Sequence, residues 1–345
     1  MIKNSMHNTD TITIAIVGCG AITETFYLPA LSRFPKVLEH LILVDNDVMR
    51  AKKMAERFHI DKVSSDFRET LSTVDGAIIA VPHHLHFPIA KCFLEQGIHV
   101  LCEKPLTDTV EEARELVNLS TEKNVSLSVN LTRRLMPASE KVKDLLQSGA
   151  IGKLLSLTYL DGSEFNWPTA SGFYFNSKIS QKGVLFDMGA HVLDLLCWWL
   201  GGKPSIVKSE NDSFGGCEAV ASLVLDYQGV SAQVRLSRLS KLPNTYVIKG
   251  ERGSIEGMVY NGNSFTFKTA QGTKTIKLSS HQTGMPDYAL KLVNNFIEVI
   301  CHGAQPLIPA QEALASIELL TEAYGKKQKF SLPWYNLKVH SYAQG

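Results

Sequence analysis

Lys104 is one residue of this 345-residue chain whose setting suggests chemistry. It lies between Glu103 and Pro105, directly after the apolar run HVLC, so a strand that reads as buried ends in two opposite charges. Because the proline ring restrains the local backbone, the ammonium of Lys104 can be aimed at one reacting oxygen, with Glu103 as its expected electrostatic partner. A solvated turn at the end of the strand is the alternative.

Asp187 and His191 form a second candidate pair, in the stretch DMGAHVLDLLCWWL. They are four positions apart, so they share one face if the stretch is helical. Histidine suits a general base because its pKa lies near neutral pH, and a carboxylate one turn away can orient it or bind a second hydroxyl. An N-capping Asp187 beside a core histidine is the structural alternative.

Gly18 and Gly20, in IAIVGCGAIT, directly follow an apolar run and precede a helical stretch. The first glycine permits a tight turn, and the second lets a pyrophosphate approach backbone N–H groups at a helix N-terminus. The third glycine of the usual pattern is replaced by Thr23, so an ordinary strand-to-helix turn remains an alternative.

Asp45 ends the next apolar run, LILVD, where a carboxylate can accept both hydroxyls of an adenosine ribose. The same charge would repel a 2′-phosphate, so Asp45 with its neighbours Asn46 and Asp47 favours NAD over NADP. The structural alternative is that Asp45 is the N-cap of the following helix. Three basic residues just downstream leave a dual preference open: Arg50, Lys52 and Lys53.

The elements that must position these residues change type along the chain. From Thr11 to about Ser148, short β-rich runs alternate with helical stretches, which predicts a parallel sheet with crossover helices. Beyond Gly152, closely spaced strands with turn signals predict an antiparallel meander. Helices are expected at about 187–200, 286–302 and 310–325. We therefore predict a Rossmann dinucleotide-binding domain at 1–148 and a C-terminal α/β domain, with a large, mostly antiparallel sheet, at 149–345.

Ligands of open α/β sheets lie beyond the carboxyl ends of the strands, where this chain places polar side chains. Pro82 and three histidines follow GAIIA, and Asn130, Arg133 and Arg134 follow SLSVN. The histidines at 83, 84 and 86 have no matching carboxylate or cysteine set elsewhere, so no metal is predicted.

These motifs together resemble the Gfo/Idh/MocA family, the relatives of glucose–fructose oxidoreductase and inositol dehydrogenase. The resemblance is carried by GCGAI, the turn from Pro82 to His86, GIHVLCEKPL and GVLFDMGAHVLDLLCWWLGG. It implies that Lys104 contacts substrate beside the nicotinamide and that Asp187 and His191 are the catalytic pair of the second domain. It also implies that His86 approaches the cofactor and that the second sheet commonly mediates oligomers.

We accordingly predict an NAD-dependent enzyme acting on a secondary alcohol or ketone of a sugar, cyclitol, sugar phosphate or nucleotide sugar. Lys104, Asp187 and His191 are the expected catalytic residues. The expected substrate-binding residues are Lys104, Arg133, Trp167, Asp187 and His191. The expected cofactor-binding residues are Gly18, Cys19, Gly20, Ala21, Ile22, Asp45, Asn46, Val81, Pro82, His83, His86, Glu103, Lys104 and Asn130.

Three cations leave open whether the substrate is phosphorylated: Arg133, Arg134 and Lys182. Lys182 stands where the family often has a glycine, and surface positions are the alternative for all three. The aromatic loop around Trp167 could stack on a sugar or simply cover the sheet.

The composition excludes several classes of partner. The net charge is +1 with no dense basic block, so nucleic acid and anionic membranes are not expected partners. The six scattered cysteines form no C-x-x-C pair, and no apolar run could span a bilayer, so a cytoplasmic location is expected. The family resemblance implies a homodimer or homotetramer formed through the second sheet.

Two other functions fit the same resemblance. A sugar-sensing regulator would bind cofactor without turnover and need not keep the lysine and the histidine. An NAD-dependent glycoside hydrolase would return the hydride within each turnover and accumulate no NADH.

Overall fold

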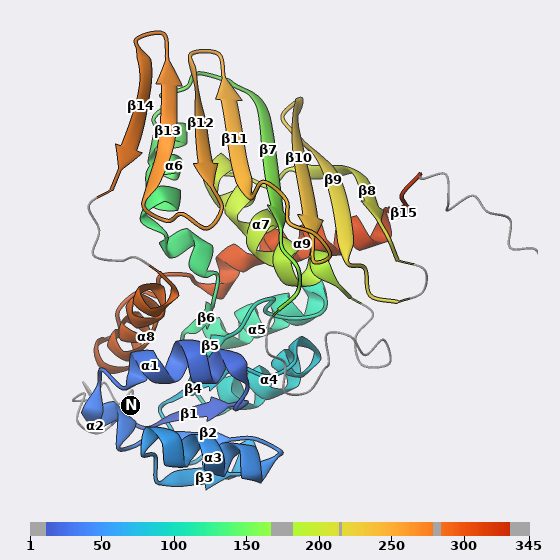
Figure 1. The fold of residues 1–345 in the computed structure, drawn as a ribbon. Helices are drawn as coiled ribbons and strands as arrows, with labels where there is room; N and C mark the ends of the chain where they lie inside the picture. The colour runs from blue at the N-terminus through green and yellow to red at the C-terminus, as the bar shows by residue number, and fades with distance from the viewer. Residues whose placement is uncertain (1–11, 167–181, 214–215, 279–283, 332–345) are drawn as a thin grey trace, which may run out of the picture.

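The computed structural model describes residues 12–166, 182–213, 216–278 and 284–331. Two sheets lie one above the other, with helices on and between them (Figure 1). The lower sheet belongs to the N-terminal part of the chain, and the upper sheet to the part after residue 153.

The first sheet is parallel throughout, with strand order β3-β2-β1-β4-β5-β6. All four residues of β1 and of β4 are buried, which explains why these strands read as continuous apolar runs rather than alternating ones. The strands are β1 (Ile14–Val17), β2 (Ile42–Val44), β3 (Lys62–Ser64), β4 (Gly76–Ile79), β5 (His99–Cys102) and β6 (Leu127–Val129). The predicted Rossmann arrangement is confirmed.

Helices connect these strands and cover both faces. Their starts follow local capping rules: Asp47 caps α3, and Thr109 with Glu112 forms a reciprocal capping box at α5. The helices of this part are α1 (Leu28–Leu31), α2 (Pro35–Leu38), α3 (Val48–Phe58), α4 (His86–Glu95) and α5 (Val110–Glu122). Helix α6 (Pro137–Gln147) follows β6 and packs in the core of the second sheet, through Ala138 and Val142. Short turns of other helical types are η1 (Thr23–Tyr27), η2 (Phe67–Thr70), η3 (His83–Leu85) and η4 (Thr132–Leu135).

The second sheet is mixed but mostly antiparallel, in the order β14-β13-β12-β11-β7-β10-β9-β8-β15. Among the described strands of this second sheet, only the pairs β7–β10 and β8–β15 are parallel. The strands are β7 (Leu154–Gly162), β8 (Ser205–Asn211), β9 (Val220–Tyr227), β10 (Val230–Ser237), β11 (Thr245–Gly250), β12 (Gly253–Met258), β13 (Ser264–Thr269), β14 (Gly272–Lys277) and β15 (Lys327–Lys329). The mostly antiparallel sheet is confirmed.

The expected meander is interrupted at its centre, because β7 lies between β10 and β11. Turn signals identify strands joined by tight turns, whereas β7 is separated from its neighbours by a helix and long connections. Leu157 and Tyr159 of β7 are 1% exposed and belong to the core beneath the sheet. Burial of these two side chains on one face fixes the register of the strand.

Three further helices complete the fold: α7 (Val184–Leu200), α8 (Met285–His302) and α9 (Ala310–Gly325). The chain order would place α8 with the second sheet, but Phe296 and Ile300 belong to the core of the first and lie against Gly76. Helix α9 serves both cores, through Ile317 in the first and Leu320 in the second. The proposed boundary between residues 148 and 149 stays a prediction.

No helix in the described part of the chain is both long enough and apolar enough to cross a lipid bilayer.

Candidate active site

A cavity of about 1040 Å³ opens between the two sheets. Its walls come from the carboxyl ends of β1, β2, β4, β5 and β6 on one side, and from α7 and the segments after β7 and β10 on the other. Every expected cofactor-binding residue lines it except Cys19, whose backbone lies behind the wall. Lys104, Arg133, Asp187 and His191 line it as well, whereas Trp167 lies outside the described residues.

The turn after β1 has the geometry that its glycines require. Gly18 has a φ of +102°, and a Cβ there would lie 2.3 Å from the carbonyl oxygen of Ala80. A Cβ on Gly20 would meet nothing within 4 Å, and Gly20 lines the cavity. Thr23, at the third glycine position, is fully buried and donates its hydroxyl to the carbonyl oxygen of Gly18 at 2.6 Å. Thr23, in place of the third glycine, therefore stabilises the turn. The turn from Gly18 to Gly20 fits a dinucleotide pyrophosphate.

Asp45 lines the cavity where the adenosine end of a dinucleotide is expected, and its carboxylate already has partners within the protein. Its carboxylate accepts hydrogen bonds from the backbone N–H of Cys19 at 2.8 Å and of Asp47 at 2.9 Å. The guanidinium of Arg50 also binds it, at 3.1 Å. Ribose hydroxyls must therefore compete with Arg50 for the carboxylate. Burial and then Asp45 raise the pKa of the Cys19 thiol to about 12, so Cys19 serves through its backbone.

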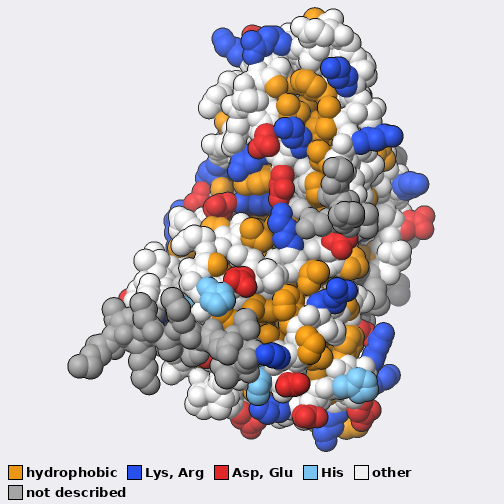
Figure 2. Space-filling model, turned by 90° about the vertical axis from the view of Figure 1, so that its left-hand side faces the viewer, with side chains coloured by type: hydrophobic (Ala, Val, Ile, Leu, Met, Phe, Trp, Pro, Cys, Tyr) orange, Lys and Arg blue, Asp and Glu red, His pale blue; other side chains and the backbone are white. Residues whose placement is uncertain are grey.

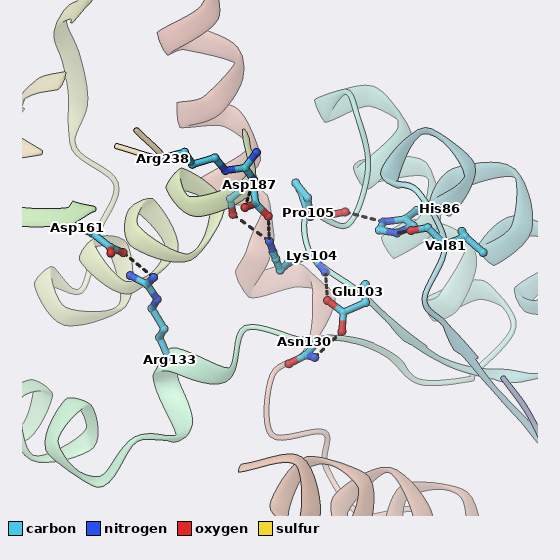
Figure 3. Close-up of polar contacts among 10 residues, drawn as sticks. All are labelled: Val81, His86, Glu103, Lys104, Pro105, Asn130, Arg133, Asp161, Asp187 and Arg238. Atoms are coloured by element: carbon cyan, nitrogen blue, oxygen red, sulfur yellow. Dashed lines mark hydrogen bonds and ion pairs between the residues drawn. The ribbon is translucent and has the colours of Figure 1, made fainter. Parts of the chain in front are cut away.

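Glu103 is not the partner of the Lys104 ammonium, and this prediction was wrong. Its carboxylate is buried and accepts hydrogen bonds from the Tyr27 hydroxyl at 2.7 Å and from Asn130 Nδ2 at 2.6 Å (Figure 3). Burial raises the pKa of Glu103, while Tyr27, Lys104 and Asn130 oppose that rise. The side chain points away from the second domain because two neutral donors of its own domain satisfy it.

His86 joins two backbone segments of the cavity wall. Its ring nitrogens lie 2.7 Å from the carbonyl oxygen of Pro105 and 2.9 Å from that of Val81 (Figure 3). Burial lowers the pKa of His86 to about 4, against the effect of the two carbonyls. His86 thus ties the turn after β4 to the Lys104–Pro105 peptide bond, which is cis, and it lines the cavity as a positioning residue.

His83 pairs with the carboxylate of Asp108 in its own domain, and Lys182 of the second domain also binds Asp108. His83 Nδ1 lies 2.7 Å from Asp108 Oδ1, and Lys182 donates to the Asp108 carbonyl oxygen at 2.8 Å. The Lys182 ammonium also lies over the Phe186 ring, 4.0 Å from its centre. The sequence left two roles open for Lys182, a loose surface position or a cation near the substrate. In the structure Lys182 lines the cavity and also connects the two domains through Asp108.

Lys104 meets the second domain at Asp187. Its Nζ donates to Asp187 Oδ1 at 2.5 Å and to the Asp187 carbonyl oxygen at 3.0 Å (Figure 3). Asp187 Oδ2 accepts a hydrogen bond from Arg238, the residue after β10. Burial would raise the pKa of Asp187, but Lys104 and Arg238 together hold it well below its usual range. The carboxylate is therefore ionised and clamped between two cations.

His191 lies one turn beyond Asp187 on α7, as the spacing predicted, but the expected orienting contact is absent. Nδ1 of His191 is buried and has no hydrogen-bond partner among the described residues, and the Asp187 oxygens bind Lys104 and Arg238. Burial, and then the charges of Lys104 and Arg133, lower the pKa of His191 well below the usual value, against Asp187. The imidazole is neutral at pH 7.

The start of α7 is fixed by a residue that the sequence did not reveal. Glu218 accepts hydrogen bonds from the backbone N–H groups of Gly183 and Leu185, each at 3.0 Å, and from the Tyr324 hydroxyl at 2.6 Å. A Cβ on Gly183 would lie 1.9 Å from the Glu218 carbonyl oxygen. This close approach lets the helix begin at Val184, three residues before the expected start, and so orients Asp187 and His191.

For the two arginines after β6 the sequence left open a phosphate site or a surface position, and both guanidinium groups instead bind buried carboxylates. Arg133 donates to Asp161 Oδ2 at 2.6 Å and to the Tyr159 hydroxyl at 2.9 Å (Figure 3). Arg134 binds Asp194 through two hydrogen bonds of 2.6 and 2.8 Å. Each guanidinium is at most 9% exposed, and each charge is already neutralised by a buried carboxylate. Arg133 still lines the cavity, but Arg134 does not.

Arg238 was missed because no local motif surrounds it. It follows β10, lies over the Phe165 ring at 4.9 Å, and is 9% exposed. Its only sequence signal is its place at the end of a strand, and the second sheet offered many such places.

Among the described residues, no group of three or more His, Cys, Asp or Glu side chains has the arrangement of a metal site.

Two family models match the chain. The model described as "Oxidoreductase family, NAD-binding Rossmann fold" covers residues 12–131, and the one described as "GFO/IDH/MocA C-terminal domain" covers residues 139–256. The chain belongs to the Gfo/Idh/MocA family, and its N-terminal part is an NAD-binding Rossmann fold.

Among curated relatives, levoglucosan dehydrogenase of Pseudarthrobacter phenanthrenivorans is 31% identical over 185 residues, which is 52% of this chain and 46% of that protein. An uncharacterized oxidoreductase of Synechocystis is likewise matched over 54% of its length, so the chain matches about half of these two relatives. Mouse trans-1,2-dihydrobenzene-1,2-diol dehydrogenase is 29% identical over 70% of this chain and 73% of that protein.

Solved structures share the whole fold at low identity. Levoglucosan dehydrogenase in complex with NADH and levoglucosan superimposes with a TM-score of 0.79, at 21% identity, over 91% of this chain and 96% of that one. KijD10, a 3-ketoreductase from Actinomadura kijaniata in complex with NADP and TDP-benzene, gives a TM-score of 0.80, at 22% identity, over 93% and 99%.

Proposed function

We propose that this protein is an NAD-dependent dehydrogenase or reductase acting on a secondary alcohol, or the corresponding ketone, of a sugar or cyclitol. One observation carries the proposal. The amine of Lys104, the carboxylate of Asp187 and the imidazole of His191, from two domains, line the same cavity as the Gly18–Gly20 turn. The family, whose relatives include sugar and dihydrodiol dehydrogenases, supports the reaction class.

The residues of the first domain would hold the dinucleotide. The Gly18–Gly20 turn offers backbone N–H groups to the pyrophosphate, and Asp45 offers its carboxylate to the adenosine ribose. When bound, NAD would supply the acceptor for the hydride of the carbinol carbon. Because Asp45 is negatively charged at this end, we propose NAD as the preferred dinucleotide, with NADP a weaker ligand.

Lys104 would position and polarise the reacting oxygen. Two of its three N–H groups donate to Asp187, and no other described residue accepts from it, which leaves the third N–H for a ligand in the cavity. The two bonds to Asp187 restrict the ammonium to one orientation, so the third N–H has a defined direction. That restriction is what a hydrogen bond to one particular oxygen requires.

His191 would take the proton of the substrate hydroxyl. A neutral imidazole has one acceptor nitrogen, and its lowered pKa keeps that nitrogen available at pH 7. In the reverse direction, the imidazolium would return the proton to the oxygen of a ketone. Asp187 would position Lys104 rather than orient the imidazole.

A substrate without phosphate suits the cavity better than a phosphorylated one. Arg133 and Arg134 are paired with buried carboxylates, and Lys182 is engaged with Asp108. Breaking either of the two buried arginine pairs to bind a phosphate would leave a carboxylate uncompensated, at a cost of about 3–5 kcal/mol. We therefore propose a neutral polyol as the substrate.

A panel of sugars, cyclitols and sugar phosphates, incubated with NAD or NADP, tests this function through the absorbance of the reduced cofactor. We expect turnover on at least one neutral polyol. Tight NAD binding without turnover on any alcohol would favour the regulator. Release of sugar from a glycoside without net NADH would favour the hydrolase. Either result would overturn the dehydrogenase.

We also propose that the protein is a homodimer or homotetramer formed through the second sheet. Residues of β10 that point away from the helices, Gln233 and Arg235, are exposed, as are Leu155, Val207 and Met258 on other strands. Figure 2 shows hydrophobic side chains gathered in the upper part of the molecule, with Lys and Arg around them. Sedimentation equilibrium would test the association, and a monomer at micromolar concentration would contradict it.

A cytoplasmic location is proposed from the cysteines. Four of the six, Cys19, Cys102, Cys197 and Cys301, are thiols buried in the two domains. Disulfides form and persist in oxidising environments such as the extracellular space and are rare in the cytosol. Fractionation of cells that produce the protein would test the location.

A further inference from the structure

Asp187 is the point where two cationic side chains of the cavity meet. Lys104 arrives from the segment after β5 and Arg238 from the segment after β10, whereas Arg133 of η4 binds Asp161 (Figure 3). Arg133 is neutralised by Asp161, so Lys104 and Arg238 are the two cations that share the Asp187 carboxylate.

The proposed reaction, on which this inference rests, moves protons close to that carboxylate. Lys104 holds one Asp187 oxygen, but its ammonium must also serve the substrate oxygen. If Lys104 were the only partner of the Asp187 side chain, the second carboxylate oxygen would have no cation beside it when an imidazolium forms on His191 after proton transfer. A partly buried carboxylate with too little positive charge around it is a better proton acceptor, because burial disfavours its charge. Asp187 would then compete with the reacting oxygen for the proton on His191.

Arg238 removes that competition, because a guanidinium does not lose its proton in proteins. It binds the oxygen that Lys104 does not bind, so this oxygen keeps a cation of its own while Lys104 also serves the substrate. Its backbone is anchored on both sides: its N–H donates to the carbonyl of Ala219, and its carbonyl accepts from the N–H of Phe165. The guanidinium lies over the Phe165 ring and is buried.

We propose that Arg238 is a positioning residue that keeps Asp187 ionised and in place throughout turnover, so that proton exchange with the substrate is confined to Lys104 and His191.

The charge of Arg238 must then affect His191, although no hydrogen bond joins them among the described residues. With Arg238 removed, the negative charge of Asp187 is offset by Lys104 alone and stabilises an imidazolium on His191. The titration of His191 should move to higher pH. A residue that only filled space would not move it.

The test follows the imidazole of His191 by NMR as pH is varied, in the full-length protein without substrate. The signal is identified by its loss in His191→Gln. We expect Arg238→Gln to shift the titration of His191 upward by about one pH unit or more. Arg238→Lys, which keeps the charge, should leave it near the wild-type pH. Lys241→Gln, which removes an exposed charge three residues further along the chain, is the matched control and should leave it unchanged.

An identical titration in wild type and Arg238→Gln would overturn the proposal. If Arg238→Gln does not fold, Arg238→Lys decides, because an upward shift of His191 in that variant would contradict a role through charge. In the enzyme assay of Arg238→Gln, the midpoint pH of the acid limb of kcat/KM should rise in parallel with the midpoint of the NMR titration. The substitution should lower kcat by a larger factor than it raises KM. The NMR result does not depend on turnover, so a failure of the proposed activity remains distinguishable from a failure of this inference.

Discussion

The two halves of the cavity are built on different principles. The cofactor half relies on backbone: Gly18 and Gly20 shape a turn, and Asp45 is held by the N–H groups of two residues close to it. The substrate half relies on side-chain charges that hold one another, with Lys104 and Arg238 on the two oxygens of Asp187.

The difference has consequences for how each half responds to substitution. Backbone N–H groups remain when a neighbouring side chain is changed, so the cofactor half should lose affinity gradually. A buried charge network loses its balance when any member is removed, because the remaining charges are left uncompensated. Substitutions in the substrate half should therefore reduce turnover sharply while leaving the dinucleotide bound.

The largest expected effect separates the halves directly. Lys104→Ala and His191→Ala should each reduce kcat by about 10²–10⁴-fold, the usual contribution of a positioned acid or base. NAD binding, followed by fluorescence titration, should remain measurable in both. Lys249→Ala, at an exposed position of β11, is the control and should behave as wild type. Wild-type rates in both variants would remove these residues from the mechanism.

A contact outside the cavity, between Arg134 of η4 and Asp194 of α7, gives the next largest effect, on stability. Asp194→Ala should lower the free energy of unfolding by about 3–5 kcal/mol, because it leaves the guanidinium of Arg134 buried without its main partner. Glu312→Ala removes the half-exposed partner of the same arginine and should cost less than about 1 kcal/mol. Denaturant unfolding measures both, and equal losses would mean that burial does not decide the strength of these pairs.

A smaller effect belongs to the cofactor half. Asp45→Ala should weaken NAD about 10–100-fold, the range for losing a charged hydrogen-bond acceptor, and should weaken NADP much less. Asp45→Asn keeps the shape and removes the charge, so it should favour NADP relative to wild type. Calorimetric titration of the two dinucleotides gives the ratio. Equal losses for both would contradict the proposed preference for NAD.

The pH dependence gives the smallest change. Because burial and two cations lower the pKa of His191, its neutral form persists below the usual histidine value of 6.5. The acid limb of kcat/KM should therefore fall below pH 6.5, and activity should be lost only as the pH drops through the lowered pKa. A limb at or above pH 7, measured with a substrate that does not titrate there, would exclude His191 as the base in this environment.

Much of the fold followed from local patterns. Continuous apolar runs identified the buried parallel strands, and the 3.6-residue period identified α7, α8 and α9 within three residues of their ends. The insertion of β7 between β10 and β11, and the packing of α8 on the first core, were not predictable. Both depend on which apolar faces pack together, and the sequence of an apolar face does not identify the face against which it packs.

The sequence by itself determined the turn at Gly18, the capped helices, and the four-residue spacing that places Asp187 and His191 on one face. These features depend on backbone conformation over a few residues. Only the tertiary structure decided that Lys104 pairs with Asp187 rather than Glu103, that Arg133 and Arg134 are neutralised, and that Arg238 completes the site. A charge takes the partner that burial brings within reach, and that partner lies far away in the chain.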